Sequence, residues 1–248
     1  MKPPVVIGAL GGSGTRVVAR IVRHACFFTG TRLNASEDAM EFVEFYDRWI
    51  NRFVRRNEVL LTDTDTAKMD SEFIDCITSH RADMPEEDEN WGWKEPRSIY
   101  LLTFFHNHFP VIIFIHVIRD GRDMAFSSNQ NQLRKHGNFL LDSRYDAFAQ
   151  PIRTAVLWNH VNLTASDYGE REMGDHYLCI RFEDLCRDAK ATVRRIAMFL
   201  ENKIDMDNVL KEIVLPESIG RWQSCDDLEL PMNIANHAKQ ALVRFGYV

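Results

Sequence analysis

Paired cysteines, long apolar runs and an excess of positive charge are all missing from this sequence. The five cysteines form no CxxC pair, and their odd number argues against a disulfide framework, so we expect reduced thiols. The apolar run near the N-terminus is too short for a signal peptide, and nowhere do about eighteen apolar residues run together. A formal net charge of −6 disfavours a nucleic-acid partner. The sequence therefore predicts a soluble cytoplasmic protein with neither membrane nor nucleic acid as a partner.

The apolar content is sufficient for one sizeable core. With 45% of its 248 residues hydrophobic, the chain is expected to form a single domain over residues 1–248. Short β-branched or aromatic runs alternate with longer helix-compatible segments, which is typical of a three-layer α/β fold with a central, mostly parallel sheet flanked by helices. The expected strands are residues 5–10, 91–94, 111–118 and 176–182; the expected helices are residues 15–26, 39–55, 98–108, 123–133, 147–168 and 190–201; the expected loops include residues 83–90 and 135–144.

A glycine-rich stretch, GALGGSGTRVV, covers residues 8–18 between the first expected strand and the first expected helix. Such a turn directs backbone N–H groups and the positive end of a helix at one point, which suits a phosphate group. The nucleotide-triphosphate form of this loop, GxxxxGK[ST], has a lysine where Thr15 stands here. The alternative is a tight turn that only packs a helix on the sheet. The candidate ligand-binding residues are Gly11, Gly12, Ser13, Gly14, Thr15 and Arg16.

A second candidate anion site follows the strand expected at residues 111–118. Arg119 stands at the carboxyl end of this strand, where ligands bind in open α/β sheets, and Ser127 follows it. The arginine offers a bidentate fork for phosphate, and the serine adds a hydroxyl donor. Alternatively, Arg119 pairs with Asp120 or Asp123, and Ser127 is an ordinary helix residue. Two such sites on adjacent strands predict a ligand with phosphates at two separated positions.

An ordered set of segments extends this pattern along most of the chain. GSGTR at residues 12–16 forms the glycine loop, and Arg119 with Ser127 follows on the later strand. Further segments are WKEP at residues 93–96, WN at 158–159, YLCIRFEDLCRDAKATVRRIAMFLE at 177–201 and SIGRW at 218–222. Together they resemble the sulfotransferase superfamily that uses 3′-phosphoadenosine 5′-phosphosulfate (PAPS), with features similar to its protein-tyrosine and heparan branches.

The resemblance implies a P-loop NTPase-like sulfotransferase fold, PAPS as co-substrate, and in-line transfer of a sulfuryl group to a hydroxyl or an amine, with no metal required. The glycine loop would hold the 5′-phosphosulfate. Arg119 and Ser127 would hold the 3′-phosphate, and Arg221 of the SIGRW segment would join them. The acceptor would be a small molecule or a glycan, and we expect residues 56–90 and 133–150 to select it.

Gly12 departs from the family pattern. The family places a lysine or arginine at this position, where the cation meets the charge that builds on the leaving bisphosphate. Lys94 matches the lysine of the family's K[DE]P segment, and Arg16 matches the arginine of the heparan variant of the loop. We expect these two side chains together to supply the missing cation. Alternatively, Lys94 pairs with Glu95 or with another neighbouring carboxylate.

The reaction also requires a general base to take the proton of the acceptor. In several branches of the family this base is a glutamate on the segment after the first helix. Glu37 best matches that position, with Asp38 and Glu41 as rivals. The alternative is structural, with Ser36 capping a helix whose first turn contains Glu37 and Asp38.

Two other functions compete with sulfuryl transfer. One is a P-loop kinase that uses ATP, which the missing lysine and the pair of Arg119 and Ser127 disfavour. The other is a non-catalytic module that senses the product, adenosine 3′,5′-bisphosphate (PAP), and the absence of a cation at Gly12 favours it.

Overall fold

The computed structural model describes residues 2–55, 61–86, 89–227 and 229–248. Within these ranges a four-stranded sheet has the strand order β2, β1, β3, β4, and every neighbouring pair is parallel. The strands are β1 (Val5–Ala9), β2 (Gly92–Lys94), β3 (Ile113–Ile118) and β4 (Tyr177–Arg181). The four strands predicted from the sequence are confirmed, with small differences at their ends.

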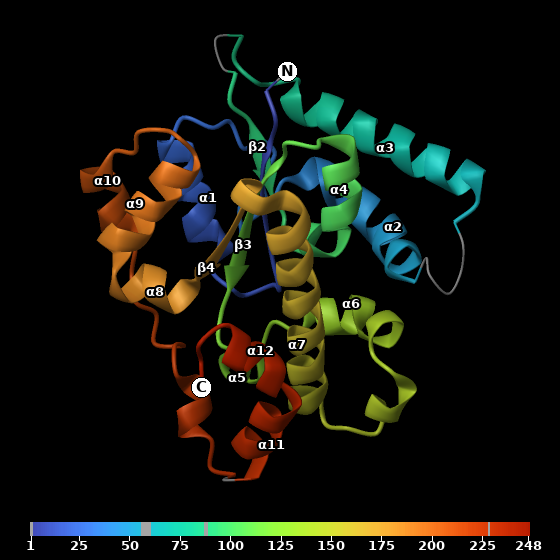
Figure 1. Cartoon of the computed structure of the whole chain (residues 1–248), viewed down its shortest axis with the longest axis vertical. Coiled ribbons are helices and arrows are strands. Elements are labelled where there is room, and N and C mark those ends of the chain that lie inside the picture. The colour runs from blue at the N-terminus through green and yellow to red at the C-terminus, as the bar shows by residue number, and fades with distance from the viewer. Residues whose placement is uncertain (1, 56–60, 87–88, 228) are drawn as a thin grey trace.

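The carboxyl ends of all four strands lie at one edge of the sheet because the strands are parallel. Ile7 of β1 pairs with Lys94 of β2 on one side and with Ile115 of β3 on the other. The glycine loop after β1 and Arg119 after β3 therefore leave the sheet at the same edge. In Figure 1 the arrowhead of β3 points from this edge toward α5 (Gly121–Ala125). Ligands of open α/β sheets bind at this edge.

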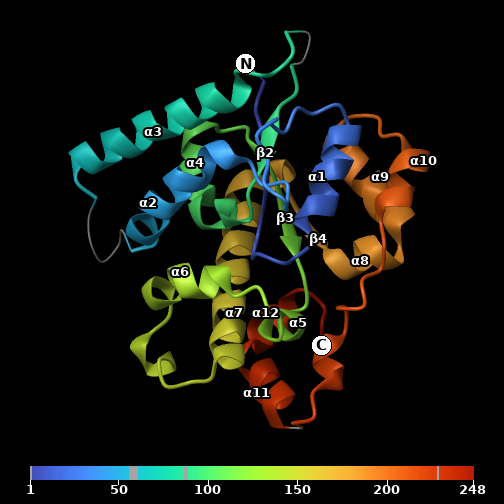
Figure 2. The ribbon, with the colours of Figure 1, turned by 180° about the vertical axis from the view of Figure 1, so that it is seen from behind.

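One face of the sheet packs against four helices (Figures 1 and 2). Because side chains alternate between the faces of a strand, Ile7, Ile115 and Ile180 point to this layer. They pack with Val18 and Val22 of the first helix in one apolar cluster. The four helices are α1 (Thr15–His24), α8 (Phe182–Arg187), α9 (Ala189–Phe199) and α10 (Met206–Glu212).

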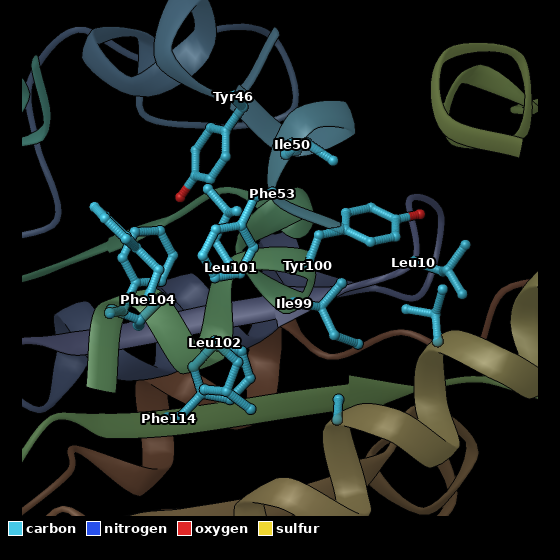
Figure 3. Packing of buried hydrophobic residues seen from close by; sticks show 14 of the residues in the cluster. Leu10, Tyr46, Ile50, Phe53, Ile99, Tyr100, Leu101, Leu102, Phe104 and Phe114 are labelled. Carbon is cyan, nitrogen blue, oxygen red and sulfur yellow. The ribbon is translucent and has the colours of Figure 1, made fainter. Parts of the chain in front are cut away.

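The other face is covered by a larger, aromatic-rich layer. Figure 3 shows Tyr46 and Phe53 directed at the segment that carries Leu101 and Phe104, with Phe114 of β3 beneath them. Burial on both faces explains why the strands read as continuous apolar runs. The elements of this layer are the 3-10 helices Met40–Phe42 and Pro96–Leu101 and the helices α2 (Val43–Val54), α3 (Asp63–Arg81), α4 (Leu102–His108) and α7 (Gln150–Tyr168).

The helix predicted at residues 123–133 is wrong. The chain instead forms the short helix α5, a turn, and then α6 (Asn131–Leu140). In the turn, the Ser127 hydroxyl accepts the N–H of Asn129 at 3.2 Å, and the Asn129 side chain accepts the N–H of Asn131 at 3.3 Å. Such side-chain bonds compete with helical ones. The loop predicted at residues 135–144 is wrong in its first part, because α6 continues to Leu140.

Five helices were not predicted from the sequence: α3, α8, α10, α11 (Glu229–His237) and α12 (Lys239–Arg244). Helix α3 begins at a capping box, in which Thr62 and Asp65 each accept the backbone N–H of the other. It lies within the segment of residues 56–90 expected to select the acceptor, of which residues 56–60 and 87–88 lie outside the described residues.

Two expectations from composition can be compared with the fold. All five cysteines lie in the described ranges, and each is a free thiol. In the same ranges no helix combines the length and the apolar character needed to cross a membrane.

His116 of β3 makes the folded state sensitive to acid. Its ring is fully buried, with Nδ1 2.6 Å from the Tyr177 hydroxyl and Nε2 2.9 Å from Oδ1 of Asn162. Burial lowers the pKa of His116 from 6.5 to about 4. Below pH 6.5 the unfolded chain therefore binds a proton that the folded chain does not. The stability contribution of the neutral ring is fully present above pH 6.5 and is lost as the pH falls toward 4.

We expect this histidine to lower the free energy of unfolding by up to about 3 kcal/mol between pH 6.5 and pH 4. Urea unfolding across this range measures the loss. The variant His116→Gln should show a shallower dependence on pH over the same interval. Equal slopes for the two proteins would contradict the assignment.

Candidate functional site

The glycine loop forms a tight turn between β1 and α1. Gly12 has φ +95° and Gly14 has φ +86°, in the left-handed region that favours glycine. A Cβ atom on Gly14 would lie 2.1 Å from the ring of Phe182, so no larger residue fits there. Ser13 and Thr15 are buried beside the two glycines. The first amides of α1 have no acceptor within the helix, so this end can donate to an anion.

Arg119 lies directly beside the glycine loop. Its side chain is only 6% exposed, and Nη1 is 3.4 Å from the Gly12 carbonyl oxygen to which it donates. Nη2 donates to the Ser218 carbonyl oxygen at 2.5 Å and to the Ser218 hydroxyl at 2.9 Å, and it lies 3.6 Å from a carboxylate oxygen of Asp123. The Nε atom is buried and has no hydrogen-bond partner among the described residues. A buried, incompletely satisfied guanidinium next to a phosphate-type loop suits a bound anion.

Ser127 lies next to the same loop. Its hydroxyl is 3.8 Å from the position that a Cβ atom would take on Gly12. The alternative of an ordinary helix residue is wrong, because Ser127 lies in the turn between α5 and α6. The structure thus brings together the glycine loop, Arg119 and Ser127.

The SIGRW segment, residues 218–222, folds over Arg119 and is held in place by Asp123. The carboxylate of Asp123 accepts the N–H groups of Gly220 at 2.8 Å and Trp222 at 3.3 Å. The guanidinium of Arg122 stacks 4.1 Å from the centre of the Trp222 ring. Asp123 therefore acts mainly as an acceptor for the backbone of this segment. Its distance of 3.6 Å from the Arg119 guanidinium is too long for a direct hydrogen bond.

Arg221 brings a second guanidinium to the same position. Its Nε donates to the Ser218 carbonyl oxygen at 3.1 Å, the oxygen that also accepts from Arg119. Burial lowers the pKa of Arg221, and the positive charge of Arg119 lowers it further. Two like charges that share one neutral acceptor would both gain from a nearby anion.

Lys94 lies in a second cluster, at the end of β2. Its side chain is 1% exposed, and Nζ donates to the Ser36 carbonyl oxygen and, at 2.5 Å, to Oδ1 of Asp38. Burial lowers the pKa of Lys94, and the charge of Asp38 partly offsets the effect. Lys94 therefore pairs with a neighbouring carboxylate, as the alternative interpretation of the sequence expected. The partner is Asp38, since Glu95 pairs with Arg97 at 2.6 Å.

Arg16 reaches the same turn from the glycine loop. Its Nη1 lies 3.4 Å from the carbonyl oxygen of Ala35, one residue before Ser36. Residues 34–38 are therefore in contact with both Arg16 and Lys94, the two side chains expected to replace a cation at position 12.

Two arginines of α1 bind the carboxylate of Glu37. Its Oε1 accepts from Arg20 at 2.8 and 2.5 Å, and its Oε2 accepts from Arg23. Burial raises the pKa of Glu37, but the hydrogen bonds from Arg20 and Arg23 outweigh it, and the pKa is lowered. The residue has φ +63° and lies in a turn in which the Asn34 side chain accepts the N–H of Ser36. The expected helix cap at Ser36 is wrong, because the helical segment begins later, at Met40.

Glu41 lies away from this turn. Its side chain is 2% exposed, and one carboxylate oxygen is 3.2 Å from Nδ1 of His80, whose Nε2 is 2.9 Å from the Gly92 carbonyl oxygen. In the described part of the chain, no three His, Cys, Asp or Glu side chains are grouped as metal ligands would be.

Sequence reasoning missed four residues of the site. Phe182 packs on Gly14, and the Arg119 guanidinium lies 5.4 Å from its ring centre. Arg20 and Arg23, which both donate to Glu37, follow the predicted Arg16 on the same face of α1, a spacing that was visible in the sequence. Nothing in the sequence pointed to Ser218 as the partner of Arg119.

Comparisons with known proteins add an independent finding. A model of the sulfotransferase family matches residues 3–206. A search of curated proteins finds no match.

Three solved structures illustrate the similarity of the fold. A sulfotransferase from Alicyclobacillus acidocaldarius is 15% identical over 98% of this chain and 94% of that one, with a TM-score of 0.58. The sulfotransferase domain of the Synechococcus PCC 7002 olefin synthase is 16% identical over 96% and 94%, with a TM-score of 0.55. Retinol dehydratase in complex with androsterone and inactive cofactor PAP is 15% identical over 96% and 80%, with a TM-score of 0.51. At these identities the likeness confirms the predicted sulfotransferase fold.

Proposed function

This chain belongs to the sulfotransferase family, and from that premise we propose that it transfers a sulfuryl group from PAPS to a hydroxyl, or an amine, of a small-molecule or glycan acceptor. The observation that carries the proposal is the convergence of Arg119 with the glycine loop at one edge of the sheet. A donor with phosphates at its 3′ and 5′ positions would meet both anion sites at once.

The donor would be held from two sides. The amides at the start of α1, with Ser13 and Thr15, would bind the 5′-phosphosulfate. Arg119, Ser127 and Arg221 would bind the 3′-phosphate. The Ser218 carbonyl oxygen accepts from both guanidinium groups, and a phosphate oxygen in its vicinity would accept from the same donors with full opposite charge.

Lys94 and Arg16 would supply the charge that position 12 lacks. Gly12 has φ +95°, a backbone conformation in which a lysine would be strained. The backbone conformation therefore explains why no lysine stands at this position. The ammonium of Lys94 has three N–H donors, and Ser36 and Asp38 take two of them. The remaining donor can meet the charge that develops on the leaving bisphosphate, in a buried position where a positive charge acts strongly.

Asp38 is the carboxylate that the geometry favours as general base. Glu37, the first choice from the sequence, has both oxygens occupied by arginines, and its lowered pKa makes it a poor proton acceptor. Glu41 is bonded to His80 instead. Asp38 accepts from the Lys94 ammonium through Oδ1 and from the neutral Asn34 side chain through Oδ2, at 2.9 Å, so an acceptor hydroxyl needs to displace only a neutral amide to reach Oδ2. Glu37 would then position the turn rather than take the proton.

Replacement of Lys94 by methionine should slow transfer without loss of donor binding. We expect Lys94→Met to lower the rate about 10²- to 10³-fold, as for other groups that stabilise developing charge, with PAP affinity changed by less than about threefold. Formation of PAP from PAPS in the presence of a panel of phenols, sugars and amines measures the rate, and melting temperature checks the fold. The exposed Lys190→Met is the matched control. An unchanged rate in Lys94→Met would exclude the lysine from catalysis.

A module that only senses PAP is the competing function, favoured by the glycine at position 12. The same acceptor panel separates the two ideas. A wild-type protein that binds PAP but forms none from PAPS with any acceptor would support sensing, whereas turnover that depends on an acceptor supports transfer.

A further inference from the structure

A polar groove of about 520 Å³ lies between α6 and the first turn of α7. These two helices lie side by side in Figures 1 and 2. The polar side chains that line the groove include Ser127, Ser128, Arg134, Asn138, Gln150 and Arg153. Its volume is in the range of small-molecule sites, so it suits a ligand of one or two rings rather than a protein surface.

The groove opens beside the glycine loop. Ser127 lines it, and the hydroxyl of Ser127 is 3.8 Å from the Cβ position of Gly12. Two residues further along the turn, the side-chain amide nitrogen of Asn129 is 3.5 Å from the Cβ position of Gly11. A molecule in the groove therefore has one end next to the loop from which the sulfuryl group would be transferred.

The charges of the groove are of one sign. Arg134 and Arg153 line it, and no aspartate or glutamate is among its lining residues in the described part of the chain. This is unusual for a protein whose net charge is −6. Arginines elsewhere in the fold, such as Arg97 and Arg122, are held by carboxylates that are themselves mostly buried.

Neither groove arginine is neutralised in this way. Arg134 donates to the neutral side chain of Asn131. Arg153 donates to Oδ1 of Asn138 at 2.9 Å, and its only carboxylate within the described residues, Asp146, is 3.6 Å away and 64% exposed. Such an exposed pair contributes little. The Nε of Arg153 is buried without a hydrogen-bond partner among the described residues.

We propose that this groove is the acceptor subsite and that the acceptor carries an anionic group, a carboxylate or a sulfate or phosphate ester, held by Arg134 and Arg153. The inference rests on the proposed sulfotransferase function and adds the chemical class of its acceptor. Ser128 and the side-chain amides of Asn138 and Gln150 would bind the neutral part of the molecule, since Ser127 is assigned to the 3′-phosphate, and the reactive hydroxyl would point to the glycine loop.

Binding of matched probes tests the proposal. Calorimetric titrations of the wild-type protein saturated with PAP would compare 4-hydroxyphenylacetate with its neutral amide, and glucose 6-sulfate with glucose. We expect at least one anionic member to bind at least about tenfold more tightly than its neutral partner, as expected for a charge-assisted contact. Arg134→Ala and Arg153→Ala should each reduce this preference, and the double variant should remove it. Arg144→Ala, with a side chain that is 71% exposed outside the groove, should keep it.

The outcomes separate this proposal from the function on which it rests. Equal binding of both members of each pair, or no binding of either anion, with PAP still bound, would overturn the groove assignment alone. A preference for the anion that survives the double variant would place the anion elsewhere and overturn it as well. Failure of PAP to bind would count against the proposed function, and the probe pairs would then still report on the groove.

Discussion

The variant Asp38→Asn is expected to lower the rate of sulfuryl transfer by about 10²- to 10⁴-fold, the usual effect of losing a general base. Asparagine keeps the shape of the side chain and an oxygen that can accept from Lys94, but it cannot take the proton of the acceptor. Donor binding should persist, because Asp38 contacts the turn and Lys94 rather than Arg119 or the glycine loop. Initial rates of PAP formation, with PAP affinity measured separately, give the two effects.

Glu37→Gln is the matched comparison. Glu37 binds Arg20 and Arg23, so its loss should loosen the turn and lower the melting temperature, with a smaller effect on the rate than Asp38→Asn. If Glu37→Gln instead abolishes transfer while Asp38→Asn retains it, the base is Glu37 and the assignment to Asp38 is wrong.

Arg119→Ala is expected to raise the dissociation constant for PAP by about 10²- to 10⁴-fold. The guanidinium would make two charge-assisted bonds to the 3′-phosphate, each contributing about 1.5 to 3 kcal/mol. Its Nε has no partner among the described residues, and Nη2 shares the Ser218 carbonyl oxygen with Arg221, so these groups can turn to a ligand without a large loss of protein contacts. Titration of PAP into the variant measures the change.

Two controls show whether the loss of PAP affinity comes from the contact with the 3′-phosphate. Arg171→Ala removes a guanidinium that is 70% exposed and bonded to Glu172, and it should bind PAP like the wild type. The affinity of Arg119→Ala for 5′-AMP, which has no 3′-phosphate, should fall much less than its affinity for PAP. An equal loss for both nucleotides would show that Arg119 supports the fold of the site instead of the 3′-phosphate.

The sheet was predictable from the sequence because apolar strands buried on both faces leave continuous apolar runs, as in β3. The break between α5 and α6 was not, because helix propensity alone does not reveal that Ser127 and Asn129 accept neighbouring N–H groups. Helix α3 was missed since its apolar residues are few, and its capping box at Thr62 was not used.

The candidate site also has a part that was predictable from the sequence and a part that was not. Motif spacing placed Arg119, Ser127 and the glycine loop correctly beside one another, because all three follow strand ends of a parallel sheet. The contacts of Glu37 and Asp38 were not predictable, since they depend on which long side chains reach the turn from other elements. Motif spacing alone does not reveal that two arginines of α1 bind Glu37.

The melting temperature of the wild-type protein with PAP, 5′-AMP and ATP tests the two-site account most directly. At about 100 times its dissociation constant, PAP should stabilise the fold by about 2.7 kcal/mol, or about 5 to 10 °C in a chain of this size. 5′-AMP at the same concentration should give a much smaller shift, because it leaves the pocket of Arg119 and Arg221 unfilled. Stabilisation by ATP without any by PAP, or equal shifts with PAP and 5′-AMP, would contradict the paired anion sites on which the proposed function depends.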